Sequence, residues 1–485
     1  MAKKNSSSVP KELLELITNY ETAKANNRQL YMDGDQLADI ADWYATEQRF
    51  AEAQEVIDYG FHLHPGNTDL LIQQAYLYLD LHLLQDAKDT VATISEEYSP
   101  EVKMLKAELL LNEEKPEEAC QLLETIAADI DLDTLVEIVH LFLDLRYPQY
   151  ALEWLEKGKP RYAEEEEYQA LTADSLLAAH ELDAAIEVYN KLIDKSPYNT
   201  AYWMGLAKIY FIKENIEKSV EACDFALAAD ETYGEAYAYR AHNYFYLNNP
   251  DAAIADYQKA IDYKAIPPML GYMFMGLSYA NKEEWEKAAD CYTRVIECFK
   301  EEDDENSILL IDTYTSKAAV VSQLGRFNEA HQLCDKAKEI DPDDSHIYLT
   351  DGKVYLEEGK KDKAAKAFEK AMELNPDVDM CHMVASAYSE NEYLHEAKTY
   401  YEMAYKIDPQ YDQVADKLSI LSLVIDNDVE KFIKYNNESQ HPLGEDVISG
   451  WIAKDGHNEE EKQMLVELLR RIKEEKNKKE NNNQF

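Results

Sequence analysis

Few side chains of this 485-residue chain are spaced as a catalytic or metal site would require. His62 and His64 precede Pro65 in a predicted turn, but no further ligand lies near them in the sequence, and a metal ion needs three or four converging ligands. The chain has no glycine-rich phosphate loop and no Gly-x-Ser-x-Gly motif. We therefore predict a non-enzymatic protein with no catalytic residues, no metal site and no cofactor.

The cysteines are spread along the chain and form no Cys-x-x-Cys pair. Zinc sites need ligands clustered at short spacing, and disulfides are rare in the cytosol. We interpret most of the cysteines as small apolar residues in helix packing. They are Cys120, Cys223, Cys291, Cys298, Cys334 and Cys381.

Acidic side chains dominate the charge, with 96 Asp and Glu against 49 Lys and Arg and a net charge of −47. Such a surface repels nucleic acid phosphates and anionic lipid head groups, so we expect neither as a partner. A basic or apolar protein segment fits better, although the excess acid also keeps a large helical surface in solution. The first residues are basic but continue without an apolar stretch, and no run is long and apolar enough to cross a bilayer. We expect a cytoplasmic protein.

The composition favours helices arranged in a repeat. Apolar residues make up 46% of the chain, and Gly and Pro number only 14 each, too few for the turns of a barrel or sandwich. Small residues recur in pairs 12 positions apart, and successive pairs follow mostly at steps of 32 to 35 residues. Two antiparallel helices with a small residue on each can approach closely. The pairs are Ala41 and Ala53, Ala75 and Ala87, Ala107 and Ala119, Val139 and Ala151, Ala173 and Ala185, Ala207 and Ser219, Ala241 and Ala253, Gly276 and Ala288, Ala318 and Ala330, Gly352 and Ala364, and Ala385 and Ala397.

Large residues and prolines follow the same period. Three residues after the first small residue stands a large one, often Tyr, on the same helix face. Another large residue, such as Tyr189 or Phe368, follows the second small residue by four positions. Much of the total of 35 Tyr is thus explained by packing. Prolines such as Pro342 and Pro376 end many units.

This pattern resembles the tetratricopeptide repeat, whose period is near 34 residues, with small residues at repeat positions 8 and 20 and aromatics at 11 and 24. Residues 352–355 and 364–371 match it closely. The resemblance implies an all-α, right-handed superhelical solenoid of about eleven antiparallel helix pairs, with the first helices lining a concave groove. We expect this solenoid over 34–411, with helical caps at both ends.

The remaining segments are assigned by their patterning. Residues 1–33 are expected to form an N-terminal tail and capping helix, 412–476 to form C-terminal capping helices, and 477–485 to be a disordered tail. The step from Gly276 to Ala318 is 42 residues, and the extra residues fall at 300–307. This acidic insertion is either a solvated loop or a docking segment.

The resemblance also places repeat positions 2, 5, 9, 12 and 13 in the groove. Position 2 is acidic in eight of eleven units, which indicates either favourable helix starts or an acidic groove for a basic partner. In the middle units the groove positions are mostly apolar and predict a partner-binding patch, unless adjacent units bury them. The predicted patch consists of Met204, Lys208, Phe211, Ala238, Tyr239, His242, Phe245, Tyr246 and Met273.

Two functions remain open from the sequence. The first is a scaffold that binds a partner polypeptide segment in the concave groove. The second is a regulatory subunit or sensor that acts by a conformational change of the solenoid. No unit combines the Lys and Asn that grip chaperone carboxyl termini, so a chaperone co-factor of that type is not expected. The sequence carries no signal for the oligomeric state.

Overall fold

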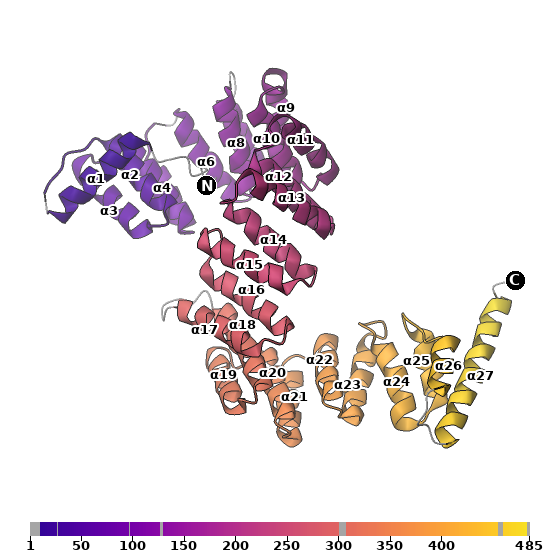
Figure 1. Ribbon diagram of the computed structural model, residues 1–485. Coiled ribbons are helices and arrows are strands. Elements are labelled where there is room, and N and C mark those ends of the chain that lie inside the picture. The colour runs from indigo at the N-terminus through magenta and orange to yellow at the C-terminus, as the bar shows by residue number, and fades with distance from the viewer. Residues whose placement is uncertain are drawn as a thin grey trace. The chain divides into compact units, whose positions relative to one another are not determined.

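The computed structural model describes residues 10–26, 28–96, 98–126, 130–299, 307–453 and 459–482. Every regular element within these ranges is an α-helix, and successive helices pair in antiparallel fashion (Figure 1). The predicted all-α solenoid of stacked helix pairs is confirmed. The insertion expected at 300–307 lies outside the described residues, except for Ser307, which begins a helix.

The chain divides into two compact units, Met1–Ala236 and Tyr237–Phe485. The first unit contains α1 (Lys11–Ala25), α2 (Gly34–Thr46), α3 (Phe50–Leu63), α4 (Thr68–Asp80), α5 (Leu84–Val91), α6 (Pro100–Asn112), α7 (Pro116–Glu124), α8 (Leu132–Asp144), α9 (Pro148–Tyr162), α10 (Glu166–Ala178), α11 (Leu182–Lys195), α12 (Thr200–Ile212) and α13 (Ile216–Ala229). The boundary between the units falls within α14 (Gly234–Tyr246).

The second unit continues the helix pairs. It contains α15 (Pro250–Asp262), α16 (Pro268–Asn281), α17 (Trp285–Cys298), α18 (Ser307–Gln323), α19 (Phe327–Ile340), α20 (Ser345–Glu357), α21 (Lys361–Leu374), α22 (Val378–Glu390), α23 (Leu394–Ile407), α24 (Val414–Asp426), α25 (Val429–Glu438), α26 (Glu445–Ile452) and α27 (Glu459–Asn482).

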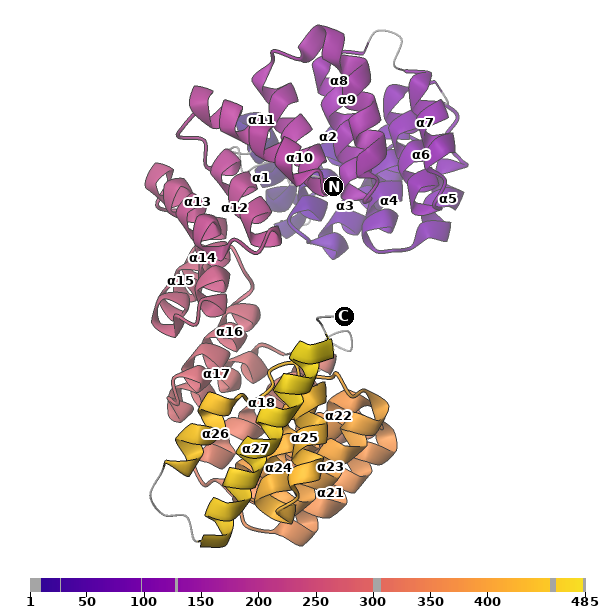
Figure 2. The ribbon, with the colours of Figure 1, turned by 90° about the vertical axis from the view of Figure 1, so that its right-hand side faces the viewer.

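The C-terminal end of the second unit is closed by α24–α27, which lie together in Figure 2. Leu423, Phe432, Ile448 and Leu468, one from each of these helices, form a shared buried core. The helix α27 runs to Asn482, beyond the boundary at 476 where a disordered tail was expected to follow. Lys and Glu, which favour helix, are frequent in this segment, so the helix can continue beyond its last apolar residue.

The small residues of each repeat are buried where the paired helices touch. Ala41 and Ala53 of the first pair are at most 1% exposed, and the other Ala pairs are equally buried. A Cβ added to Gly352 would lie 2.4 Å from the ring of Phe368, so a larger residue would separate α20 from α21. The spacing of 12 therefore reflects backbone contact, as the sequence predicted.

The first helix of each repeat ends at a left-handed residue in repeat position 15. Gln48 has φ 59° there, and glycine takes the position at Gly359, with φ 79°. The next amide then bonds back to the carbonyl of position 11, as from Arg49 N to Tyr44 O at 2.8 Å. This geometry satisfies the carbonyls at the helix end and reverses the chain. It fixes the start of the second helix.

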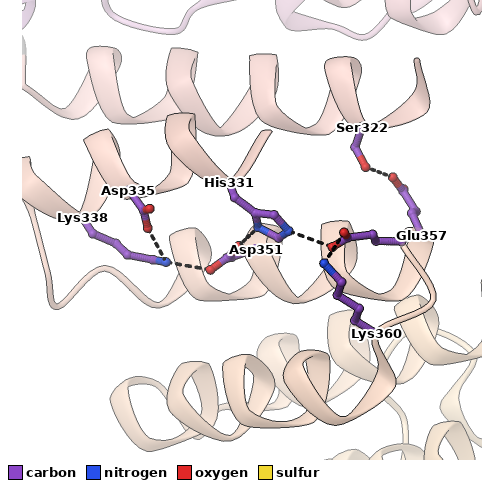
Figure 3. Close-up of polar contacts among 8 residues, drawn as sticks. Ser322, His331, Asp335, Lys338, Asp351, Glu357 and Lys360 are labelled. Carbon is purple, nitrogen blue, oxygen red and sulfur yellow. Dashed lines mark hydrogen bonds and ion pairs between the residues drawn. The ribbon is translucent and has the colours of Figure 1, made fainter. Parts of the chain in front are cut away.

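A buried ion network joins α19 to α20 in the second unit (Figure 3). The Asp351 carboxylate, whose residue is 5% exposed, accepts a hydrogen bond from Lys338 Nζ at 2.6 Å and lies 2.6 Å from His331 Nδ1. Burial alone would lower the pKa of Lys338, but the contact with Asp351 outweighs it and raises that pKa. In the first unit the same repeat positions, 21 and 7, carry Gln54 and Gln74, which exchange hydrogen bonds of 2.8 and 2.9 Å. Position 7 therefore ties one repeat to the preceding one.

Replacing Asp351 by Asn should loosen this joint. The variant leaves the half-buried Lys338 without its main countercharge, so we expect local stability to fall by about 1–3 kcal/mol. The control is Asp335→Asn, because Asp335 pairs with the same lysine at 3.3 Å but its side chain is 70% exposed. Hydrogen exchange of α19 and α20 amides measures the effect. Equal exchange in the two variants would contradict a structural role for Asp351.

Candidate polypeptide-binding site

Three first helices of the first unit, α8, α10 and α12, surround a hollow of about 510 Å³. Its apolar walls include Val136, Ala170 and Ala201, and its acidic groups include Glu167 and Asp174. These residues occupy positions 2, 5 and 9 of their repeats, as expected for the lining of a groove. The hollow thus combines apolar walls with carboxylates.

Two of the carboxylates in the hollow are held by tyrosines. Tyr189 of α11 donates a hydrogen bond to Asp174, and Tyr202 of α12 donates one to Glu166 at 2.9 Å. Burial raises the pKa of Asp174, although the Tyr189 hydroxyl opposes this shift. Burial and then the contact with Glu166 raise the pKa of Tyr202 to about 12, so the hydroxyl stays a donor at neutral pH. Each carboxylate is therefore oriented before any ligand arrives.

A further group of acids lies on the neighbouring first helices. Glu108 of α6 is half-buried and has Asp80 of α4 and Asp144 of α8 as its acidic neighbours. Burial, followed by the repulsion from these two carboxylates, raises the pKa of Glu108 to about 7. Burial and then the neighbouring Asp42 raise the pKa of Asp80. Such shifts are a cost to the empty protein and mark a candidate functional site.

The acids at repeat position 2 do not cap their helices. The cap of α4 is Asn67, whose side chain accepts from Leu70 N at 3.0 Å. Asp69, at position 2 of this helix, instead has a pKa raised by burial and then by the neighbouring Asp35, Glu96 and Glu101. Asp35 and Glu101 hold position 2 in the repeats on either side. Glu101 differs from Asp69, because hydrogen bonds from the Ser99 hydroxyl and from its own backbone amide lower its pKa, as is favourable at a helix start. The acidic groove remains a prediction.

The patch predicted from the sequence draws on both units. Of its members in the first unit, Met204 is buried, at 1% exposed, and is not available to a partner. The reason is that α12 is apolar on nearly every face, so most of its side chains, Met204 among them, are buried or half-buried. Lys208 is half-buried and pairs with Glu235 at 2.8 Å, and Phe211 is also half-buried.

Three of the members in the second unit, His242, Phe245 and Tyr246, form an aromatic cluster with Phe274. The His242 ring lies 5.0 Å from the Tyr246 ring and 5.6 Å from the ring of Phe274, and Phe245 packs on both of these rings. Burial lowers the pKa of His242, which favours the neutral ring. Tyr246 is 61% exposed. The half-buried members are Ala238, Tyr239, His242, Phe245 and Met273.

Sequence reasoning missed the acids at positions 9 and 13 and the aromatic Phe274. Asp42, Glu108 and Asp174 hold position 9, and Asp80 and Asp144 hold position 13. Their recurrence in the first five repeats was a signal in the sequence, but the many other acids of the chain concealed it.

Models of one family match along most of the repeat array. The tetratricopeptide repeat matches residues 44–109, 171–233, 240–303, 352–378 and 378–411. The chain belongs to the tetratricopeptide repeat family. The predicted recognition is confirmed, and the groove-lining positions above are those of tetratricopeptide first helices.

Known tetratricopeptide proteins resemble the chain in part. It is 24% identical to anaphase-promoting complex subunit 7 of Dictyostelium discoideum over 49% of this chain and 40% of the relative. It is 25% identical to a TPR repeat-containing protein of Methanocaldococcus jannaschii over 46% of this chain and 39% of the relative. The chain therefore spans about two fifths of the length of these curated relatives.

Solved structures of similar architecture include two long helical arrays. Yeast Tom70 aligns with 91% of this chain and 96% of its own, at 17% identity and a TM-score of 0.41. The APC/C hetero-tetramer Cut9–Hcn1 aligns with 84% of this chain and 92% of that one, at 14% identity and a TM-score of 0.35.

Within the described residues no group of three or more His, Cys, Asp or Glu side chains is placed to hold a metal ion. Among the described helices, none combines the length and the apolar character needed to span a membrane.

Replacing Glu108 by Gln should stabilise the first unit at high pH. Because the pKa of Glu108 is raised to about 7 in the folded chain, the folded state binds the proton more tightly than the unfolded state, and stability falls as pH rises from about 4.5 to about 7. The neutral Gln removes this loss, so we expect a gain of about 1–3 kcal/mol at pH 8 and little change at pH 4.5.

The free energy of unfolding of the full chain is measured in urea at both pH values. Hydrogen exchange of the α6 amides locates the change. Glu118→Gln, at an exposed acid on α7, is the control. If Glu108→Gln gains no more stability at pH 8 than this control, the result would contradict a raised pKa of Glu108.

Proposed function

We propose that the chain is a non-enzymatic scaffold that holds an extended, basic segment of a partner polypeptide in the groove of its first unit. The observation that carries the proposal is the hollow of α8, α10 and α12, where oriented carboxylates stand beside apolar walls. The family supports protein binding in general, because tetratricopeptide arrays present extended concave surfaces. The charge of the segment is inferred from this chain's own groove.

The chemistry of the hollow suits Lys and Arg side chains. Their apolar stems can pack on surfaces such as Val136 and Ala170, while their charged ends reach Glu167 and Asp174. Hydrogen bonds between such ends and carboxylates are about twice as strong as those between neutral groups. A bound cation would also oppose the burial that raises the pKa of Asp174. Binding therefore offsets a cost that is already present in the empty groove.

The net charge of −47 supports a protein partner over nucleic acid or an anionic membrane, since both carry the same sign of charge as the groove. The aromatic cluster of His242, Phe245, Tyr246 and Phe274, together with Met273 of the predicted patch, remains a second proposed contact surface. It is suited to an apolar stretch of the same or another partner. A groove that closes on its ligand would make the scaffold a regulatory subunit, which is the alternative function.

Neutralising the hollow should weaken binding of a basic peptide. The probe is a labelled peptide of about eight residues that alternates Lys or Arg with Ala, and spans about 26–29 Å when extended. For Glu167→Gln with Asp174→Asn we expect about 10-fold weaker binding by fluorescence anisotropy, because two charge-assisted contacts are lost. Affinity for the wild-type chain should also fall as salt is added.

Two double variants serve as controls. Glu153→Gln with Glu187→Gln removes the same charge from exposed sites on the second helices α9 and α11 and should leave affinity nearly unchanged. His242→Glu with Met273→Glu alters only the aromatic cluster and should also retain the basic peptide. Equal losses in the hollow and outer-helix variants would mean that net charge alone attracts the peptide. A loss confined to the His242 and Met273 variant would move the site to the second unit.

A further inference from the structure

In several repeats, a side-chain hydrogen bond joins the second helix to a groove-facing residue of the first helix. A tyrosine at repeat position 24 reaches the residue at position 9 of the first helix in the same repeat. Tyr257 O–H lies 3.3 Å from His242 Nδ1, and Tyr401 O–H lies 3.1 Å from Ser386 Oγ. Tyr189 bonds to Asp174 in the same way. Their rings are buried, at 1–2% exposed, while position 9 faces the groove.

Of these three pairs, only the one between Tyr189 and Asp174 ends on a carboxylate. An ionised carboxylate accepts hydrogen bonds and cannot donate them, so the Tyr189 hydroxyl must be the donor. It bonds to Oδ1 and leaves lone pairs on Oδ2 for another donor. The surrounding helices bury Asp174 away from bulk solvent, but its side chain is exposed within the hollow, so a ligand can reach it.

The Tyr189 ring is held in place by the next repeat. A Cβ added to Gly205 of α12 would lie 2.2 Å from this ring, so the α12 backbone packs directly against it. The hydroxyl therefore has a fixed position under the groove. In another repeat Phe368 takes position 24 and is fully buried, so the fold accepts a ring without the hydroxyl there.

We infer that Tyr189 is a positioning residue for the basic segment: its hydroxyl holds the Asp174 carboxylate, in its charged form, at the floor of the groove. This inference rests on the proposed function. Tyr202 has the same relation to Glu166, from the next first helix. The tyrosines of this hollow would then act through their hydroxyls as well as through the packing of their rings.

The groups around Asp174 determine how its charge responds to pH. Burial raises the pKa of Asp174, while the Tyr189 hydroxyl of α11, and after it Lys208 of α12 and His140 of α8, favour the charged form. Glu166 and Glu167 of its own helix and Tyr202 also line the hollow. Without the Tyr189 hydroxyl, one interaction that favours the charged form of Asp174 is lost while its burial is unchanged. The pKa of Asp174 should therefore rise further. A protonated Asp174 no longer attracts a cation.

The test is Tyr189→Phe in the full chain, with Tyr401→Phe as the matched control in the other unit. Both variants lose one buried hydroxyl from repeat position 24, and circular dichroism checks that each stays helical. Affinity for the Lys and Arg peptide is measured from pH 5 to pH 9. We expect Tyr189→Phe to bind about 10-fold more weakly at pH 6, with its pH midpoint for binding moved upward and the difference narrowing by pH 9. Tyr401→Phe should follow the wild type.

A second readout does not depend on the peptide. Carboxyl carbon NMR of chains labelled at Asp follows the Asp174 titration, assigned with Asp174→Asn. A higher pKa of Asp174 in Tyr189→Phe than in the wild type supports the positioning role. If neither the wild type nor the variants bind the peptide, the proposed function fails, but this pKa still tests the role of Tyr189. An unchanged Asp174 titration, or an unchanged pH profile of binding, would overturn the inference and leave Tyr189 as a packing residue.

Discussion

Close contact between the two helices of each pair is the constraint on which the other features depend. Small residues such as Ala41 and Ala53 bring the backbones together, and a left-handed residue at position 15 turns the chain between them. Once this contact is made, position 24 of the second helix lies under position 9 of the first. Buried tyrosines can then reach residues that face the groove. The close contact between paired helices thus determines both the packing of the repeat and the arrangement of its groove residues.

The acidic side chains of this solenoid fall into two kinds, which differ in the charge of their neighbours. Asp351 is buried but has Lys338 and His331 beside it, so its charge contributes to the joint between two repeats. Glu108 has other carboxylates as neighbours, and its charge is a cost to the folded chain. Charges of the first kind stabilise the array. A charge of the second kind is favoured when a cation lies beside it, and we therefore place the proposed binding site in the first unit.

Much of the fold followed from the sequence, because backbone contact requires small residues and their pairs recur from Ala41 to Ala397. Val139, the weakest member of the pattern, is as buried as the alanines. The site was harder to predict. The exposure of Met204 depends on how adjacent helices cover α12, which periodicity alone does not specify. The tyrosines were interpreted as packing residues, and the bond from Tyr189 to Asp174 appears only when the two helices are placed side by side.

The central claim is that the groove of the first unit receives a basic polypeptide segment. Hydrogen–deuterium exchange of the full chain, with and without the Lys and Arg peptide, tests it most directly because it locates the contact without a mutation. We expect slower exchange in the first helices α8, α10 and α12, with the amides of α9 and α11 little changed. Protection confined to second helices, or to the second unit, would contradict it.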